Sequence, residues 1–274
     1  MSTVTIQKPD IFIIGVHRRC GSNFLTGALK LLGHIQEPQP LAEDYLLEYS
    51  SLLMEYVQRT CDKRYKKRFT AEKDFHACQQ RLCRRLGDGL RNFLRDYISP
   101  GARLITHTPD TDYLEYFPDF FPDAQLVLLV RDGRDVVESA ARSWPSESYS
   151  YWMRSWARGA RRLLDFMHGV GQHHADKWLL VRYEDLLTDR QVMENVLRFL
   201  GEDPAEYPWE KFENLPLRGS STERGGRAEL HWDPVPKRKD FNPIGRWRSW
   251  SRWRRWQFRR IAAREMIELG YPLD

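Results

Sequence analysis

The sequence predicts an α/β fold in three layers, with a mostly parallel sheet flanked by two layers of helices. Short apolar runs bounded by polar residues indicate buried strands, and segments with apolar residues every three to four positions indicate helices between them. Strands that alternate with helices form parallel sheets covered on both faces. Ligands of such sheets bind beyond the carboxyl ends of the strands, so the polar loops there should form one site.

The first half of the chain opens with a strand, a tight loop and a helix. Residues 11–16 (IFIIGV) form the expected strand, the polar loop after it holds Gly21, and a helical pattern over 24–32 ends at a glycine. Residues 41–98 also have apolar residues at helical spacing. This pattern predicts a helical insertion over 34–100.

The second half alternates in the same way. Further strands are expected at 103–106, 125–130 and 178–181, and helices at 135–142, 151–167 and 190–200. Asp135 is the expected start of its helix, because a short acidic side chain can cap the first N–H groups. The chain has no internal repeats or low-complexity linkers, so we expect residues 1–274 to form a single domain.

Composition argues against several classes of protein. Hydrophobic residues make up 41% of the chain and aromatic residues 13%, too many for a disordered protein. No apolar run approaches the ~18 residues of a membrane span, and the first residues lack the pattern of a secretion signal. The four cysteines are too few for a disulfide scaffold. We therefore expect a cytoplasmic protein with no membrane partner.

Positive charge is concentrated in one segment. The formal net charge is +5, and residues 246–260 (RWRSWSRWRRWQFRR) hold seven arginines and no acidic residue, so the rest of the chain is slightly acidic. Within this segment Trp250, Trp253 and Trp256 recur every three residues. We interpret this stripe as core packing covered by arginine stems. The alternative is a nucleic-acid-binding module built on the segment.

The loop after the first strand has the layout of a phosphate cradle. A strand, a glycine-containing loop and a helix direct backbone N–H groups and the helix dipole at an anion. The loop lacks the GxxxxGK[ST] pattern of nucleoside triphosphatases and the GxGxxG pattern of dinucleotide-binding proteins. The residues placed to contact an anion are Arg18, Arg19, Cys20, Gly21, Ser22 and Asn23.

A second anion site is predicted after the third strand. Arg131 ends the apolar run AQLVLLV, and Ser139 lies one turn inside the helix that follows. The guanidinium fork and the hydroxyl can bind one anion together.

The two motifs resemble the nucleotide-binding motifs of the PAPS-dependent sulfotransferases, where PAPS is 3′-phosphoadenosine 5′-phosphosulfate. HRRCGSNFL (17–25) is similar to the loop that cradles the 5′-phosphosulfate. LVRDGRDVVES (129–139) is similar to the motif that holds the 3′-phosphate, through Arg131 and Ser139. The resemblance implies a P-loop-like fold in which the helical insertion covers the substrate. It also implies PAPS as co-substrate, its desulfated form PAP as product, and no metal.

Three further stretches extend the resemblance. Tyr183 in VRYEDL matches a tyrosine that lies near the nucleotide, and His107 in ITHTP matches the histidine of the family's KTHxP. A third nucleotide motif is matched by Gly245, Arg246 and Trp247. The basic pair that usually precedes this motif is missing, and the nearest substitutes are Lys237, Arg238 and Lys239.

The implied reaction is in-line transfer of a sulfuryl group to a hydroxyl or amine of a small-molecule acceptor, such as a secondary metabolite. Arg19 would stabilise charge on the leaving phosphate, and His107 would be the general base. In some sulfotransferases of glycans and protein tyrosines the base is a carboxylate instead. The candidates for that role here are Glu37, Glu43 and Asp44.

Two rival functions are kept open. A P-loop-like small-molecule kinase would bind ATP with Mg²⁺ more tightly than a 3′-phosphorylated nucleotide. A nucleic-acid-binding module would bind DNA or RNA with a steep dependence on salt. Because the arginine-rich segment begins at a nucleotide motif, we expect a small nucleotide rather than nucleic acid as the anion.

Overall fold

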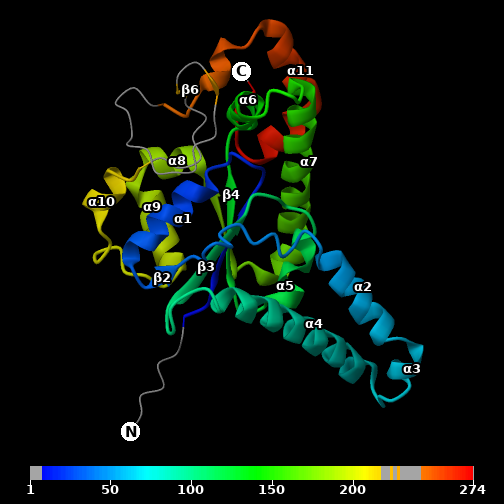
Figure 1. Ribbon diagram of the computed structural model, residues 1–274. Coiled ribbons are helices and arrows are strands. Elements are labelled where there is room, and N and C mark those ends of the chain that lie inside the picture. Colours follow the sequence, from blue (N-terminus) through cyan, green and yellow to red (C-terminus); the bar gives the residue numbers. More distant parts are fainter. Residues whose placement is uncertain (1–7, 217–222, 225–226, 229–241, 274) are drawn as a thin grey trace.

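The computed structural model describes residues 8–216, 223–224, 227–228 and 242–273. Its centre is a parallel sheet in the order β2-β3-β1-β4-β5 (Figure 1). The predicted parallel α/β fold is therefore confirmed. The strands are β1 (Ile11–Gly15), β2 (Ile35–Gln36), β3 (Arg103–Thr108), β4 (Gln125–Val130) and β5 (Trp178–Arg182), and a separate short hairpin pairs β6 (Glu223–Arg224) with β7 (Arg227–Ala228).

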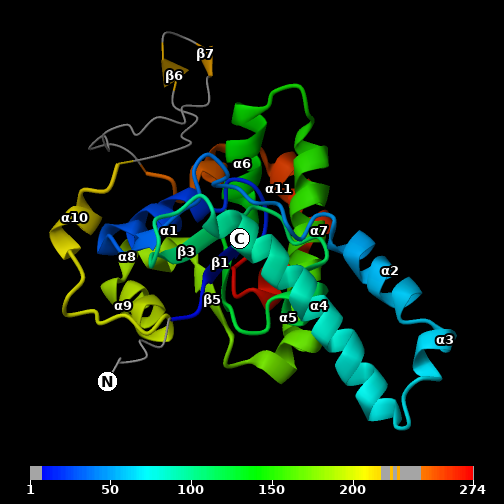
Figure 2. The same ribbon diagram turned by 60° about the horizontal axis from the view of Figure 1, so that its bottom comes forward.

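Helices cover both sides of this sheet (Figures 1 and 2). One layer contains α1 (Ser22–Leu29), α8 (Tyr183–Thr188), α9 (Arg190–Phe199) and the outlying α10 (Trp209–Glu213). The other contains α5 (Phe117–Phe120), α6 (Gly133–Ser143), α7 (Tyr149–His168) and α11 (Arg252–Glu268). Because both faces are covered, β1 and β4 are almost wholly buried, which explains their near-continuous apolar sequences.

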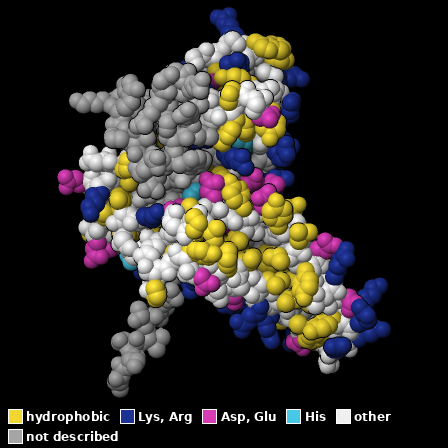
Figure 3. All heavy atoms as spheres, in the orientation of Figure 1, with side chains coloured by type: hydrophobic (Ala, Val, Ile, Leu, Met, Phe, Trp, Pro, Cys, Tyr) yellow, Lys and Arg dark blue, Asp and Glu magenta, His cyan; other side chains and the backbone are white. Residues whose placement is uncertain are grey.

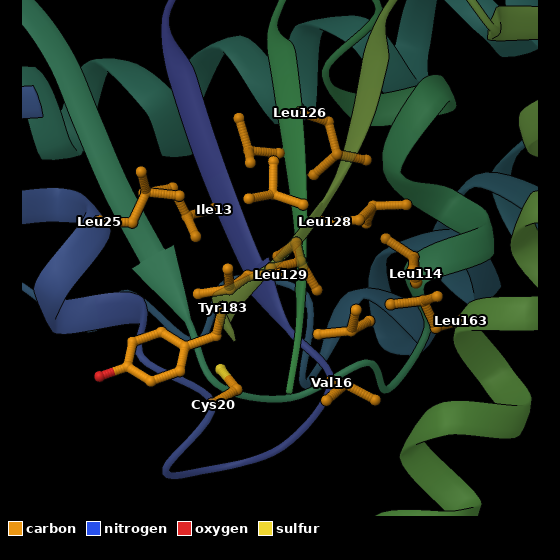
Figure 4. Close-up of a cluster of buried hydrophobic side chains, with 14 of the residues drawn as sticks. Ile13, Val16, Cys20, Leu25, Leu114, Leu126, Leu128, Leu129, Leu163 and Tyr183 are labelled. Carbon is orange, nitrogen blue, oxygen red and sulfur yellow. The ribbon is translucent and has the colours of Figure 1, made fainter. Parts of the chain in front are cut away.

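The core continues under the loop that joins β1 to α1. Figure 4 shows Val16 and Cys20 with their side chains among core residues such as Leu129, and Tyr183 beside them. Val16 and Cys20 are at most 1% exposed. The loop is thus anchored from below by apolar packing, and its polar residues are left on the other side.

The predicted helical insertion forms an arm that projects from the sheet (Figure 2). It consists of α2 (Ser50–Thr60), α3 (Lys63–Lys66) and α4 (Glu72–Arg95). The prediction of a helix from residue 41 was wrong for residues 41–49. These residues are not helical and run along the edge of β3. There Glu43 forms a β-bridge with His107, and the Asp44 carboxylate accepts hydrogen bonds from two threonine hydroxyls of β3.

The interpretation of the tryptophan stripe as core was wrong for two of its three members. Trp250 is 3% exposed, but Trp253 is 66% exposed and Trp256 is 50% exposed. The helical period explains this, because the buried face of α11 is defined by residues further along, which leaves both indoles on the outside. These core-facing residues are Phe258, Ala262 and Met266. None of the described helices is long and apolar enough to cross a membrane.

Candidate functional site

The sheet topology brings the predicted loops to one edge. β3, β1 and β4 are neighbours and parallel, so their carboxyl ends lie side by side. Arg19 follows β1, His107 lies near the end of β3, and Arg131 follows β4 directly. The expected convergence of these three loops is therefore confirmed.

Gly21 shapes the loop between β1 and α1. It precedes the first residue of α1 with φ 103°, a conformation that side chains strongly disfavour. A Cβ atom at this position would also lie 2.3 Å from the ring of Tyr183. Gly21 offers no side chain to cap α1, which leaves the start of the helix accessible to an anion.

Cys20 contributes to this loop through its backbone. Its side chain is fully buried, and burial raises the pKa of the thiol to about 11. The thiol is therefore neutral and faces the core rather than the loop's polar side.

Three arginines gather beside the loop. Arg19 Nε donates a hydrogen bond to Ser139 Oγ at 3.1 Å. Arg131 donates to the carbonyl oxygens of Arg19 at 2.8 Å and Pro243 at 2.6 Å, and its Nε has no hydrogen-bond partner. Burial, together with the positive charges of Arg131 and Arg246, lowers the pKa of Arg19 to about 10. The predicted pair Arg131 and Ser139 is thus joined by Arg19.

The carboxylates of Asp135 and Glu184 lie close enough to attract Arg131, but neither is paired with it. Across the described ranges, no carboxylate forms an ion pair with Arg19 or Arg131. The Arg131 guanidinium instead lies 4.9 Å from the centre of the Tyr183 ring. Like charges held together at a partly buried site repel one another, and a ligand with several negative charges would relieve that repulsion.

Asp135 holds the third motif against α6. Its carboxylate accepts hydrogen bonds from the backbone N–H of Gly245 at 2.7 Å and of Trp247 at 3.3 Å. The expectation that Asp135 begins the helix was wrong, because Asp132 caps α6 by accepting from the N–H of Arg134. Sequence reasoning missed this role because an acidic residue near a helix start is explained equally well by capping. Lys237, Arg238 and Lys239 lie outside the described residues.

His107 is enclosed between two carboxylates. Its Nδ1 lies 3.3 Å from Glu37 Oε1 and its Nε2 lies 3.7 Å from Glu43 Oε1, too far for a hydrogen bond. Burial alone would lower the pKa of His107, but the two carboxylates outweigh it and raise that pKa to about 9. At neutral pH the imidazole therefore carries two protons.

The structure distinguishes the three candidate carboxylates. Glu37 accepts a hydrogen bond from Lys30 Nζ at 2.7 Å. Burial alone would raise the pKa of Glu37, but His107 and Lys30 outweigh it and lower that pKa to about 2. Asp44 is occupied by the hydroxyls of β3 and the N–H of Leu46. Glu43 accepts from the Tyr45 hydroxyl at 2.6 Å and lines a cavity, so it alone of the three borders open space there.

Two cavities border the cradle. The first has a volume of about 420 Å³ and is lined by Phe24, Tyr183, Leu186, Leu187, Thr188, Phe212, Glu213, Leu215, Asn242, Pro243 and Ile244. The second has a volume of about 230 Å³ and is lined by Arg18, Arg19, Ser22, Asn23, Glu43, Tyr45, Pro109 and Trp144. Residues of the loop or of the first turn of α1 line both. One ligand could therefore cross the cradle from one cavity to the other.

A family model described as "Sulfotransferase family" matches residues 9–206. The chain belongs to the sulfotransferase family. No curated protein matches this sulfotransferase. Its fold is similar to that of the "Sulfotransferase Domain from the Curacin Biosynthetic Pathway", with 18% identity, coverage of 97% of this chain and 99% of that one, and a TM-score of 0.53. It is also similar to mouse sulfotransferase SULT7A1 complexed with PAP, with 11% identity, coverage of 94% and 84%, and a TM-score of 0.52.

Proposed function

We propose that this sulfotransferase moves the sulfuryl group of PAPS to a hydroxyl or amine of a small-molecule acceptor. The observation that carries the proposal is the pair of arginines Arg19 and Arg131 beside the β1–α1 loop, neither of which forms an ion pair with a carboxylate of the described residues. PAPS presents anionic groups on both its 5′ and 3′ sides, which suits a cluster that spans two motifs. Family membership and the likeness to a structure complexed with PAP support the same nucleotide.

Each part of the nucleotide has a matching feature. The 5′-phosphosulfate would lie at the start of α1 next to Arg19, and the 3′-phosphate between Arg131 and Ser139. The purine would enter the 420 Å³ cavity, where Phe24 and Phe212 offer aromatic rings. Stacking of a base on such rings stabilises binding by ~1–3 kcal/mol per base.

The acceptor would enter the 230 Å³ cavity, whose wall includes Arg19 and Glu43. Its oxygen or nitrogen forms a bond to sulfur while the bond from sulfur to the 5′-phosphate oxygen breaks. Arg19 compensates the charge that grows on the released phosphate. Glu43 accepts the acceptor's proton, because it lines this cavity and is ionised at neutral pH, where His107 holds its pKa below the usual value.

In this mechanism His107 is a positioning residue. From the sequence alone, His107 is the expected base and a carboxylate is the alternative. The raised pKa of His107 and the position of Glu43 at the cavity favour the alternative. His107 keeps its proton, orients Glu43 and balances the charge of Glu37.

Nucleotide binding tests the proposal directly. PAP at 100 times its Kd should stabilise the folded protein by about 2.7 kcal/mol, measured as a rise in Tm and confirmed by calorimetric titration. Ser139→Ala should weaken PAP binding because it removes the hydroxyl. Arg131→Lys should weaken it as well, because Lys keeps the charge but loses the guanidinium fork. Arg81→Ala, an exposed substitution on the arm, is the matched control and should leave it unchanged.

Two results would contradict this function. One is a thermal melt in which PAP gives no protection. The other is greater protection by ATP with Mg²⁺ than by PAP, which would favour a kinase.

A further inference from the structure

α11 carries a cluster of exposed aromatic and basic side chains, named here the Trp–Arg pole. Trp253 and Trp256 stack on each other with ring centres 4.6 Å apart and planes inclined by 21°. More than half of the surface of Trp253 and half of that of Trp256 is exposed to solvent, although large indole rings are usually well buried. The other members are Arg252, Arg255, Arg259 and Arg260, all exposed.

The pole is strongly positive. Residues 246–260 contain no acidic residue, and none of the pole's four arginines pairs with a carboxylate in the part of the chain that the structure describes. Arg260 instead lies 5.7 Å from the centre of the Trp256 ring. The nearby Arg254 is already used, since its guanidinium covers the Tyr149 ring at 3.7 Å. Arg255 also donates a hydrogen bond to the carbonyl oxygen of Arg248 and lies 5.3 Å from the centre of the Trp247 ring. An anionic partner would complement the exposed positive charges of the pole.

The position of the pole indicates what kind of surface it meets. α11 lies at one end of the molecule, and Figure 3 shows apolar and basic side chains together on that outward-bulging end. A protruding surface with exposed indoles can contact a broad and deformable binding partner, whereas a small ligand needs a cavity. Tryptophan prefers the interface between lipid headgroups and acyl chains, and arginine forks bind phosphate groups bidentately.

Nucleic acid fits the pole less well. In proteins that bind single-stranded nucleic acid, the bases stack on open faces of aromatic side chains. Trp253 and Trp256 cover one face of each other, so the pair offers only its outer faces.

We propose that the Trp–Arg pole binds the surface of an anionic phospholipid membrane. The two indoles enter the headgroup region, and the arginines around them bind lipid phosphates. The attachment is peripheral and reversible. It revises the expectation of no membrane partner, which rested on the lack of a membrane-spanning segment.

Vesicle sedimentation tests this proposal with the full chain. The protein should sediment with vesicles of mixed phosphatidylglycerol and phosphatidylcholine, and much less with vesicles of phosphatidylcholine alone. Replacing Trp253 and Trp256 together by Ala should lower the partition coefficient at least ~10-fold. Arg252→Gln with Arg259→Gln should lower it about 30-fold, because each arginine near an anionic surface contributes ~1 kcal/mol.

A matched pair controls for net charge. Arg81→Gln with Arg85→Gln removes the same charge from the exposed face of α4 and should leave sedimentation unchanged. Each pole variant should keep the wild-type Tm, because both indoles and both arginines are exposed. Vesicle sedimentation is measured without PAP, and PAP binding is measured without vesicles, so the membrane proposal can fail without the proposed function failing.

Three outcomes would overturn the proposal. They are equal sedimentation with both kinds of vesicle, loss of sedimentation in the α4 pair to the same extent as in the pole variants, and tighter binding to a single-stranded DNA oligonucleotide than to anionic vesicles at the same salt concentration. The last would assign the pole to nucleic acid.

Discussion

His107 illustrates how a side chain's role depends on its neighbours. From sequence it has the pKa of an ordinary histidine and the place of a general base. In the fold, Lys30 and His107 share the Glu37 carboxylate, and Glu43 approaches from the other side of the ring. Neither contact is visible in the sequence, because Glu37 and Glu43 lie some 60 to 70 positions away from His107. A histidine whose pKa is about 9 orients a base better than it serves as one.

Turnover of Glu43 variants tests this assignment. Glu43→Gln should lower kcat by at least ~100-fold while PAP affinity stays the same, because the amide cannot accept the proton. The assay uses labelled PAPS and an acceptor recovered by screening hydroxyl- and amine-bearing metabolites. Glu48→Gln, five residues away and exposed, is the control and should have wild-type kcat. Wild-type turnover in Glu43→Gln would return the role of base to His107.

At the scale of elements, the regular parts of the fold were predictable and the irregular parts were not. The sequence pattern located β4 at its observed bounds because a strand buried on both faces is apolar throughout. Residues 41–49 are helical by pattern, but contacts with β3 outweigh their weak local preference. The prediction that the tryptophan stripe is buried was wrong for a related reason. A spacing of three residues places side chains on one face of a helix, but it does not show whether that face is buried.

The β1–α1 loop gives a test of backbone geometry. Gly21 and Gly33 both have positive φ, 103° and 74°, but only at Gly21 would a Cβ atom meet another residue. Gly33→Ala should destabilise the fold by ~1–2 kcal/mol through backbone strain and keep PAP binding. Gly21→Ala should destabilise it further and abolish PAP binding, because the Tyr183 ring must move. Urea denaturation and calorimetry measure the two effects, and equal losses of PAP affinity would refute the argument.

At the scale of the whole molecule, the His107 cluster makes stability depend on pH. The pKa of His107 is raised in the folded state, so its contribution is complete below its ordinary pKa of 6.5 and is lost as the pH rises through about 9. The pKa of Glu37 is lowered, so its contribution is complete above 4.5 and is lost as the pH falls through about 2. The two contributions are both complete between pH 4.5 and pH 6.5, so the cluster stabilises the fold most in that range.

We expect the free energy of unfolding to fall by up to about 3 kcal/mol as the pH rises from 6.5 to above 9. Urea denaturation at a series of pH values measures this fall. In His107→Gln, whose side chain does not titrate, the fall should be much smaller. An equally steep fall in that variant would show that another group causes it.

The arginine cluster also affects how the loaded protein behaves in an electric field. The free chain has a formal net charge of +5, to which the arginines of the cluster contribute. Each phosphate of PAP carries a charge of about −1.5 to −2, so one bound molecule would cancel most of that excess. Loaded and empty protein should then migrate as separate bands in native electrophoresis and elute at different salt concentrations from a cation exchanger. Occupancy could be followed in this way in unlabelled protein, before any acceptor is known.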